Sequence, residues 1–390
     1  MSFRFHASIS DHESSDEALA QILDDAQQHL DSADVAFLFF SAHHSEQAEE
    51  LAEKLMLEFE PRVLVGCSCE GVIGVDREIE RAPGMALMLG FAPGVDVRPF
   101  HISTDEWREL ISDRNMLTDK LGLGERSRAI IGFGDPWTTA TAQFLSALDA
   151  ASPAAPLIGG MASGARSQGG NRLICNDTVS SEGFVGVSLS GAIQVQTVVS
   201  QGCKPIGQPM VITKSKDNII EQLGGKPALI VLRDVVNALD PADQKLLQHG
   251  LLMGRAISEY RERFARGDFL VRNIIGADQD QGSIALGDYA RVGQTVQFHV
   301  RDAATADEDL SLMLDGVSPP AGALLFSCNG RGMNLFDAPN HDVRVSREKL
   351  NAPPIAGFFA AGELGPVGGK NFIHGHTASF ALFRELKEQV

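Results

Sequence analysis

The stretch PPIAGFFAAGELGPVGGKNFIHGHTASFALF, from Pro353 to Phe383, decides how this chain folds. It holds six of the 39 glycines of the chain, and its surroundings are otherwise largely apolar. Glycine lets a backbone take angles that side chains forbid, and lets it approach a strand or a ligand closely. An apolar run from Thr377 to Phe383 follows directly. The pattern predicts a shaped loop between two buried strands, with three polar members: Glu363, His374 and His376.

Two other stretches share the spacing of this one. They are PRVLVGCSCEG and PLIGGMASG, at residues 61–71 and 156–164. All three have an apolar run, a glycine and a second glycine five residues later, and all three lie between apolar strands. We read this as one strand–helix–strand–loop–strand unit used three times. The alternative is that glycine pairs at strand ends are common in α/β proteins. The pairs are Gly66 and Gly71, Gly159 and Gly164, and Gly357 and Gly362.

The expected fold class is α/β (α+β), with mixed sheets flanked by helices. The runs at residues 35–40, 129–134 and 323–328 are nearly all apolar, which is typical of strands in sheets covered on both faces. Amphipathic segments precede or follow these strands. A length of 390 residues favours two domains. We place the boundary at Gly224-Gly225, which gives domains 1–224 and 225–390.

Composition excludes several classes of function. The net charge of −18 repels phosphate backbones, so nucleic acid is not an expected partner. Apolar runs stop well short of a membrane span, and the acidic start of the chain does not resemble a secretion signal. The five cysteines make a sparse, odd set, which favours reduced thiols in the cytoplasm over a disulfide framework.

The segment LLFSCNGRGMNLF, residues 324–336, ends the third buried strand. Ligands tend to bind at strand ends in α/β sheets. Cys328, Asn329 and Arg331 bring a thiol, an amide and a guanidinium within four residues, so we expect them to face a ligand. Alternatively, Cys328 is a small buried filler and Arg331 forms a structural ion pair. A Cys328 nucleophile served by His376 is conceivable chemistry, but no orienting acid is evident.

His374 and His376 would share one face if they lie on a strand. Two such imidazoles can hold a metal or haem, act as acid and base, or hydrogen-bond a ligand. The alternative is that each is a satisfied buried histidine. Further ligands at zinc-like spacing are not evident, so no metal site is predicted here.

Four residues of the first two copies are candidates to close the site. Cys67 belongs to a C-x-C pair without further cysteine partners, which disfavours a metal. Glu70 stands beside Gly71 as Glu363 stands beside Gly362, and a carboxylate among glycine amides can recognise an amine or cap a turn. The remaining two candidates belong to the second glycine stretch: Gly160 and Ser163.

These segments resemble the FIST family of sensory proteins, named for F-box and intracellular signal transduction. The resemblance implies a cytoplasmic small-ligand sensor, with amino acids as the usual ligands. It also implies output through a signalling protein such as a histidine kinase or a cyclic-dinucleotide enzyme, here a separate partner because no such module is attached. Some relatives are haem-based nitric-oxide sensors. The matching segments are GCSCEGVIG (66–74), PLIGGMAS (156–163), SQGCKPIG (200–207), IIEQLGGKPAL (219–229), LLFSCNGRG (324–332), IAGFFAAGELGPVGG (355–369) and HGHTASFALF (374–383).

The prediction is a non-enzymatic sensor without a cofactor, in which Arg331 holds a ligand carboxylate and Glu363 holds an amine. A haem or metal gas sensor using His374 or His376 is the second hypothesis. A cysteine-dependent enzyme at Cys328 is the third, and an adaptor with an acidic protein-binding surface is the fourth.

Overall fold

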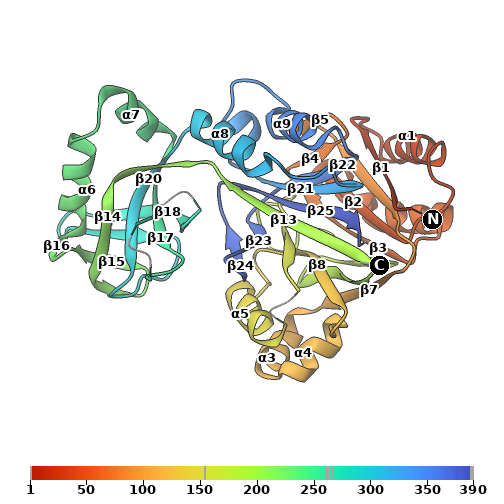
Figure 1. Cartoon of the computed structure of the whole chain (residues 1–390), viewed down its shortest axis with the longest axis horizontal. Coiled ribbons are helices and arrows are strands. Elements are labelled where there is room, and N and C mark those ends of the chain that lie inside the picture. Colours follow the sequence, from red (N-terminus) through yellow and green to blue (C-terminus); the bar gives the residue numbers. More distant parts are fainter. Residues whose placement is uncertain (1, 153–154, 261–262, 265–266, 387–390) are drawn as a thin grey trace. The chain divides into compact units, whose positions relative to one another are not determined.

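A computed structural model describes residues 2–152, 155–260, 263–264 and 267–386. The chain forms two compact units (Figure 1). Unit 1 contains residues 1–199, 310–373 and 377–390, and unit 2 contains residues 200–309 and 374–376. Helices and mixed sheets make up unit 1, which confirms the predicted fold class. The boundary at residue 224 stays a prediction about sequence domains.

Unit 1 is built from three copies of one arrangement: a strand, a helical segment, a strand, a helix, a strand, a hairpin and a final strand. The first copy comprises β1 (Arg4–Ser10), α1 (Ser15–Gln27), β2 (Val35–Ser41), η1 (Ala42–Gln47), α2 (Ala48–Phe59), β3 (Val63–Cys69), β4 (Gly71–Gly74), β5 (Arg77–Glu80) and β6 (Met85–Phe91). The second comprises β7 (Val95–Ile102), η2 (Thr104–Glu106), α3 (Trp107–Ser112), α4 (Arg114–Leu121), β8 (Ser127–Gly134), α5 (Thr141–Ala151), β9 (Leu157–Met161), β10 (Leu173–Cys175), β11 (Thr178–Ser180) and β12 (Phe184–Gly191).

The third copy has the same order, but unit 2 is inserted between its first strand and its first helix. It comprises β13 (Ile193–Gln201), α8 (Ala303–Leu314), β21 (Gly322–Cys328), η4 (Gly332–Asn334), α9 (His341–Leu350), β22 (Ile355–Ala360), β23 (Glu363–Val367), β24 (Lys370–His374) and β25 (Thr377–Glu385).

Strand pairing repeats with the elements. In each copy the second strand is parallel to the third and antiparallel to the last: β2 to β3 and β6, β8 to β9 and β12, β21 to β22 and β25. The three resulting sheets have one layout, with the orders β1-β6-β2-β3-β10-β11, β7-β12-β8-β9-β23-β24 and β13-β25-β21-β22-β4-β5. The predicted threefold repetition is therefore confirmed.

The hairpin of each copy does not complete its own sheet. The β4–β5 hairpin of the first copy adds to the third copy through β4 and β22. The third copy's β23 pairs with β9 of the second, and the second copy's β10 pairs with β3 of the first. The exchange forms a closed cycle, so each sheet depends on two copies.

The first glycine of each pair is required for the same structural reason in all three copies. Gly66, Gly159 and Gly357 lie opposite a residue of the parallel neighbour strand. A Cβ atom at these positions would lie 2.0, 1.8 and 1.7 Å from a carbonyl oxygen of that strand. Only a residue without a side chain allows so close an approach.

One phenylalanine from each copy meets the other two in the shared core. In each copy, this phenylalanine comes directly after the residue that pairs with the repeated glycine. The three are Phe39, Phe133 and Phe326. Their ring centroids are 5.3, 5.8 and 6.3 Å apart, and Phe358 packs against all three. Aromatic pairs at such distances add to the free energy gained from burial. The three copies therefore share one hydrophobic core.

The helices cover the outer faces of the sheets. In the second copy, Trp107 of α3 and Phe144 of α5 belong to one hydrophobic cluster with Ile130 of β8. Helix α1 begins after its N-cap Ser14 and ends at Gln27. The helical segment after β2 begins as the 3-10 turn η1 and continues as α2. Strand β1, whose burial alternates irregularly, and two short helices, α3 and Pro241–Leu246, were not predicted from the sequence.

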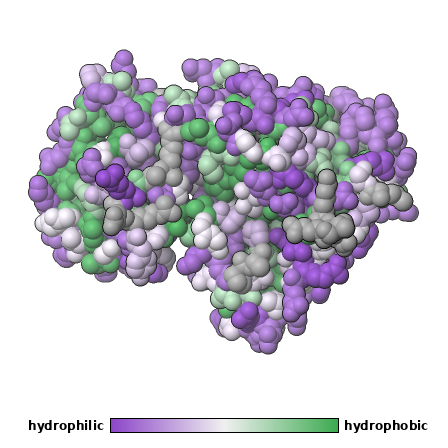
Figure 2. Space-filling view, in the orientation of Figure 1, coloured by the Kyte–Doolittle hydropathy of each residue, from purple (hydrophilic) through white to green (hydrophobic). Residues whose placement is uncertain are grey.

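The described residues of unit 2 form a seven-stranded sheet with helices and a core of its own. Apolar surface is visible over it in Figure 2, and Ile275 and Val292 are each 62% exposed. Among the described residues, the helices are all too short or too polar to cross a membrane. The unit comprises β14 (Cys203–Lys216), β15 (Ile219–Leu223), β16 (Lys226–Pro227), α6 (Ala228–Asn237), α7 (Pro241–Leu246), η3 (Leu247–His249), β17 (Leu251–Ala256), β18 (Phe269–Asp278), β19 (Ser283–Leu286) and β20 (Thr295–Arg301).

Candidate functional site

A cluster of buried charged side chains lies at the carboxyl end of β21, inside unit 1. The chain leaves β21 at Cys328 and turns through Gly330 and η4 before it enters α9. The exchanged hairpin β4–β5 of the first copy borders this turn, since the backbone N–H of Met333 donates to both carboxylate oxygens of Glu80, at 3.0 and 3.1 Å. Gly332, in the turn, has a φ of +51°, and a Cβ there would collide with Glu80. Two copies therefore build the site.

The centre of this charged cluster is Arg331, which is fully buried. Its Nε and Nη2 atoms each donate to Asp342 over 2.7 Å, in the bidentate geometry that suits a carboxylate. Burial opposes the ionised form of Asp342, but the Arg331 guanidinium outweighs it and holds the pKa of Asp342 well below its usual range. Ser327 also donates to Asp342, over 2.7 Å. The Nη1 atom of Arg331 has no hydrogen-bond partner among the described residues.

Glu363 is a further fully buried ionisable residue of the cluster. Its Oε2 atom accepts from the backbone N–H and the hydroxyl of Thr377, at 3.1 and 2.7 Å. Its Oε1 atom has no partner of ordinary geometry in the described chain. Burial raises the pKa of Glu363 to about 8, although Thr377, the Cys328 thiol and the Arg331 charge favour ionisation. Near neutral pH this carboxyl is therefore mostly a neutral acid.

A third carboxyl, Glu78, reaches the cluster from the exchanged hairpin. Its Oε1 atom accepts from the backbone N–H of Val343 at 2.9 Å, and its buried Oε2 atom lacks a partner among the described residues. Burial and the nearby Asp342 charge raise the pKa of Glu78 to about 8. One guanidinium thus faces one ionised and two mostly neutral carboxyl groups, so the cluster can bind or release a proton near neutral pH.

A small cavity lies between the turn that follows β21 and the β4–β5 hairpin. It offers about 10 Å³ to the centre of a water molecule, which is room for about one water. Asn329, which follows Cys328, lines this cavity, and its buried Oδ1 atom lacks a hydrogen-bond partner in the described chain. A ligand larger than water therefore requires the wall to move. The other lining residues are Glu70, Gly71, Glu80, Arg81, Asn334 and Phe359.

The raised pKa of Glu363 predicts a pH-dependent stability. Between its ordinary value of 4.5 and the folded value of about 8, the unfolded state binds fewer protons. Protonation of Glu363 therefore stabilises the folded state fully below pH 4.5, and this contribution is lost as the pH rises through 8. We expect Glu363→Gln to be more stable than the wild type above that range, by several kcal/mol, and to differ little in acid.

Urea unfolding across this pH range measures the effect. The matched control is Glu13→Gln, which changes an exposed carboxylate and should follow the wild-type curve at every pH. If the free energies of unfolding of Glu363→Gln and of the wild type change in parallel with pH, the Glu363 carboxyl is not held neutral.

The structure brings some of the predicted site residues together. Arg331 and Glu363 interact, and Cys328 and Asn329 lie at the same strand end. Glu70 lines the small cavity, and its backbone N–H donates to Ser163 Oγ over 2.9 Å. Gly160 of β9 pairs with Glu363 of β23.

The other predicted residues lie elsewhere. Cys67 is buried in the hydrophobic core, where burial raises the pKa of its thiol well above the usual value. His374 and His376 belong to unit 2, where His376 Nε2 lies 3.0 Å from Asn273 Oδ1. The strand expected across the two histidines is wrong, because β24 ends at His374 and His376 has a left-handed φ of +62°.

Sequence reasoning missed the partners that the fold supplies. Asp342 lies in the first turn of α9, and Glu78 and Glu80 belong to a hairpin some 250 residues earlier in the sequence. For Asp342 the only available signal was an acidic residue shortly after the Arg331 loop. For Glu78 and Glu80 no local pattern pointed to this site, since the exchange of hairpins joins them to it.

Comparison with known proteins identifies the family. The FIST N domain matches residues 34–226, and the FIST C domain matches residues 228–366. "Uncharacterized protein MT0656" of Mycobacterium tuberculosis is 38% identical over 355 residues, which cover 90% of this chain and 91% of that protein. "Uncharacterized protein Mb0898c" of Mycobacterium bovis is 37% identical over 355 residues, with 90% of both chains covered.

A solved structure titled "Cyanuric acid hydrolase: evolutionary innovation by structural concatenation" aligns with 99% of this chain and 100% of that chain. Its TM-score of 0.34 and identity of 8% are too low to support any argument about this protein. The domain matches and the two mycobacterial relatives agree over most of the sequence, and FIST domains are sensor domains of signal transduction. The chain therefore belongs to the FIST family, with a FIST N domain followed by a FIST C domain.

Proposed function

We propose that this protein is a cytoplasmic sensor that binds an amino acid or a similar small metabolite at the Arg331–Glu363 cluster and signals through a separate protein. The observation that carries the proposal is the pair of unsatisfied atoms, Arg331 Nη1 and Glu363 Oε1. Buried polar atoms without partners are rare, and a ligand is one way to satisfy them. None of the five cysteines forms a disulfide, which suits a reducing compartment.

The chemistry of the two groups complements an amino acid. The Arg331 guanidinium is permanently charged, and its Nη1 nitrogen remains available to donate to a carboxylate. An ammonium group beside Glu363 would favour the ionised carboxylate and lower its pKa, so binding near neutral pH would release a proton. The buried position excludes water, which strengthens both interactions.

Ligand entry requires the turn after β21 to open, and its contacts suit this movement. Met333 is held by Glu80, and Asn334 Oδ1 accepts from Arg81 over 2.5 Å. These contacts lie at the exposed surface, where hydrogen bonds exchange with water at little net cost. Opening would separate the turn from the β4–β5 hairpin, and a partner that binds one of the two arrangements would register the ligand.

Isothermal titration calorimetry with the individual amino acids tests this proposal. We expect binding by at least one of them, and the heat should depend on the ionisation enthalpy of the buffer because a proton is released. Glu363→Gln should weaken binding at least tenfold, whereas Glu13→Gln should bind like the wild type. If every amino acid gives neither heat nor a shift in melting temperature, this ligand class is excluded.

A further inference from the structure

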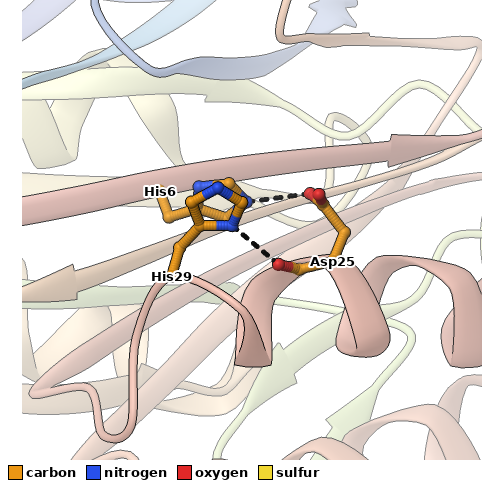
Figure 3. Close-up of side chains that lie close together, drawn as sticks. All are labelled: His6, Asp25 and His29. Atoms are coloured by element: carbon orange, nitrogen blue, oxygen red, sulfur yellow. Dashed lines mark hydrogen bonds and ion pairs between the residues drawn. The ribbon is translucent and has the colours of Figure 1, made fainter.

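Two imidazoles and one carboxylate meet in the first copy, on elements distinct from those of the charged cluster. His6 lies on β1, Asp25 lies in the last turns of α1, and His29 follows the end of that helix. Asp25 and His29 are four residues apart, so they project from one side of the helix end. Figure 3 shows the two rings lying over one another, with Asp25 beside them.

The donor atoms of the three side chains are already close together. One ligand atom from each residue lies within 4.8 Å of the others. His6 Nε2 is 2.8 Å from Asp25 Oδ2, and His29 Nδ1 is 2.9 Å from the backbone oxygen of Asp25. The two imidazole rings are stacked, with centroids 4.0 Å apart and an interplanar angle of 10°.

We propose that His6, Asp25 and His29 bind a divalent transition-metal ion of the zinc type, with one coordination position open to solvent. Two imidazole nitrogens and a carboxylate oxygen form a donor set that zinc accepts, and three protein ligands leave a fourth position for water. The Asp25 side chain is 49% exposed, so an ion reaches the site from solvent without unfolding of the chain.

Support around the carboxylate strengthens the assignment. Ser8 is buried, and its hydroxyl donates to Asp25 Oδ2 over 2.8 Å. Such outer contacts fix the orientation of a metal-binding carboxylate.

Metal binding requires one defined movement. A single ion cannot lie in the planes of two parallel stacked rings, so the rings must tilt apart. His29 is exposed and can rotate about its side-chain bonds. It would give up one hydrogen bond to a backbone oxygen, a modest net loss for an exposed group.

The test uses the full chain after removal of metals with a chelator. We expect one equivalent of Zn²⁺ in calorimetry, and Co²⁺ should give the visible absorption of a low-coordinate complex with nitrogen ligands. Bound zinc should also raise the melting temperature. Asp25→Asn and His29→Ala should each weaken binding of Zn²⁺ by about tenfold or more, while His43→Ala, which changes a histidine outside the cluster, should leave it unchanged.

Folding is checked by circular dichroism and by melting in the presence of the chelator. If Asp25→Asn does not fold, His29→Ala decides alone, because His29 is exposed. A wild type that binds neither Zn²⁺ nor Co²⁺ would overturn the proposal, and so would equal affinities in the wild type and the His29→Ala variant. Either result would leave the three residues as a hydrogen-bonded surface cluster.

Discussion

A chain cut after residue 226 is expected to lose cooperative folding completely, although it keeps the entire FIST N domain match. The cut removes the third copy of the repeated arrangement. Strand β9 then loses β23, β4 loses β22, and Phe39 and Phe133 lose the aromatic rings of the third copy. Unpaired strand edges and an open core favour aggregation.

The decisive comparison is with a variant that also loses a long segment but keeps all three copies. Cys203 and Arg301 are paired neighbours on β14 and β20, so a short Gly/Ser linker can replace residues 204–300. We expect this variant to unfold in one cooperative transition, whereas residues 1–226 should show none by circular dichroism and calorimetry. A sharp transition in the 1–226 fragment would mean that two copies suffice.

Replacement of Gly357 by alanine is expected to destabilise the protein by at least about 3 kcal/mol, or to prevent its soluble production. The new methyl group would lie 1.7 Å from the carbonyl oxygen of Leu325, and this neighbour is backbone that cannot rotate away. Relief requires the parallel strands β21 and β22 to separate at the centre of the fold. Gly66→Ala and Gly159→Ala should have effects of similar size, because their contacts are 2.0 and 1.8 Å.

Gly124→Ala is the matched control for this series. A Cβ at Gly124 meets no atom within 4 Å, so the free energy of unfolding should change by less than about 0.5 kcal/mol. Urea unfolding of all four variants gives the comparison. Three core variants as stable as Gly124→Ala would refute the steric explanation for the repeated glycines.

The repetition in the fold could be predicted because glycine leaves a trace in the sequence. Gly66, Gly159 and Gly357 stand where strands approach too closely for a side chain, and their common spacing revealed the three copies. The first strand and the first helical segment of each copy were not recognised as parts of the repeat, since no such steric demand marks them. The exchange of hairpins could not be predicted, because β4 and β22 pair across about 280 residues.

The candidate site was predictable only on the side of the third copy. Glycines next to Arg331 and Glu363 marked two of its charged residues. The ion pair of Arg331 with Asp342 is the structural alternative that the sequence left open, and it occupies two of the three guanidinium nitrogens. Glu78 comes from the first copy, and its burial depends on tertiary packing that no local pattern encodes.

The cyclic exchange of hairpins is the pairing expected of a ring with threefold symmetry. Three separate polypeptides of the repeated type would satisfy the same pairings as a symmetric ring of identical subunits, each lending its hairpin to the next. Joining the copies in one chain removes the dependence on protein concentration and lets each junction differ in sequence. A fully buried arginine, Arg331, follows β21, so the three junctions are not equivalent.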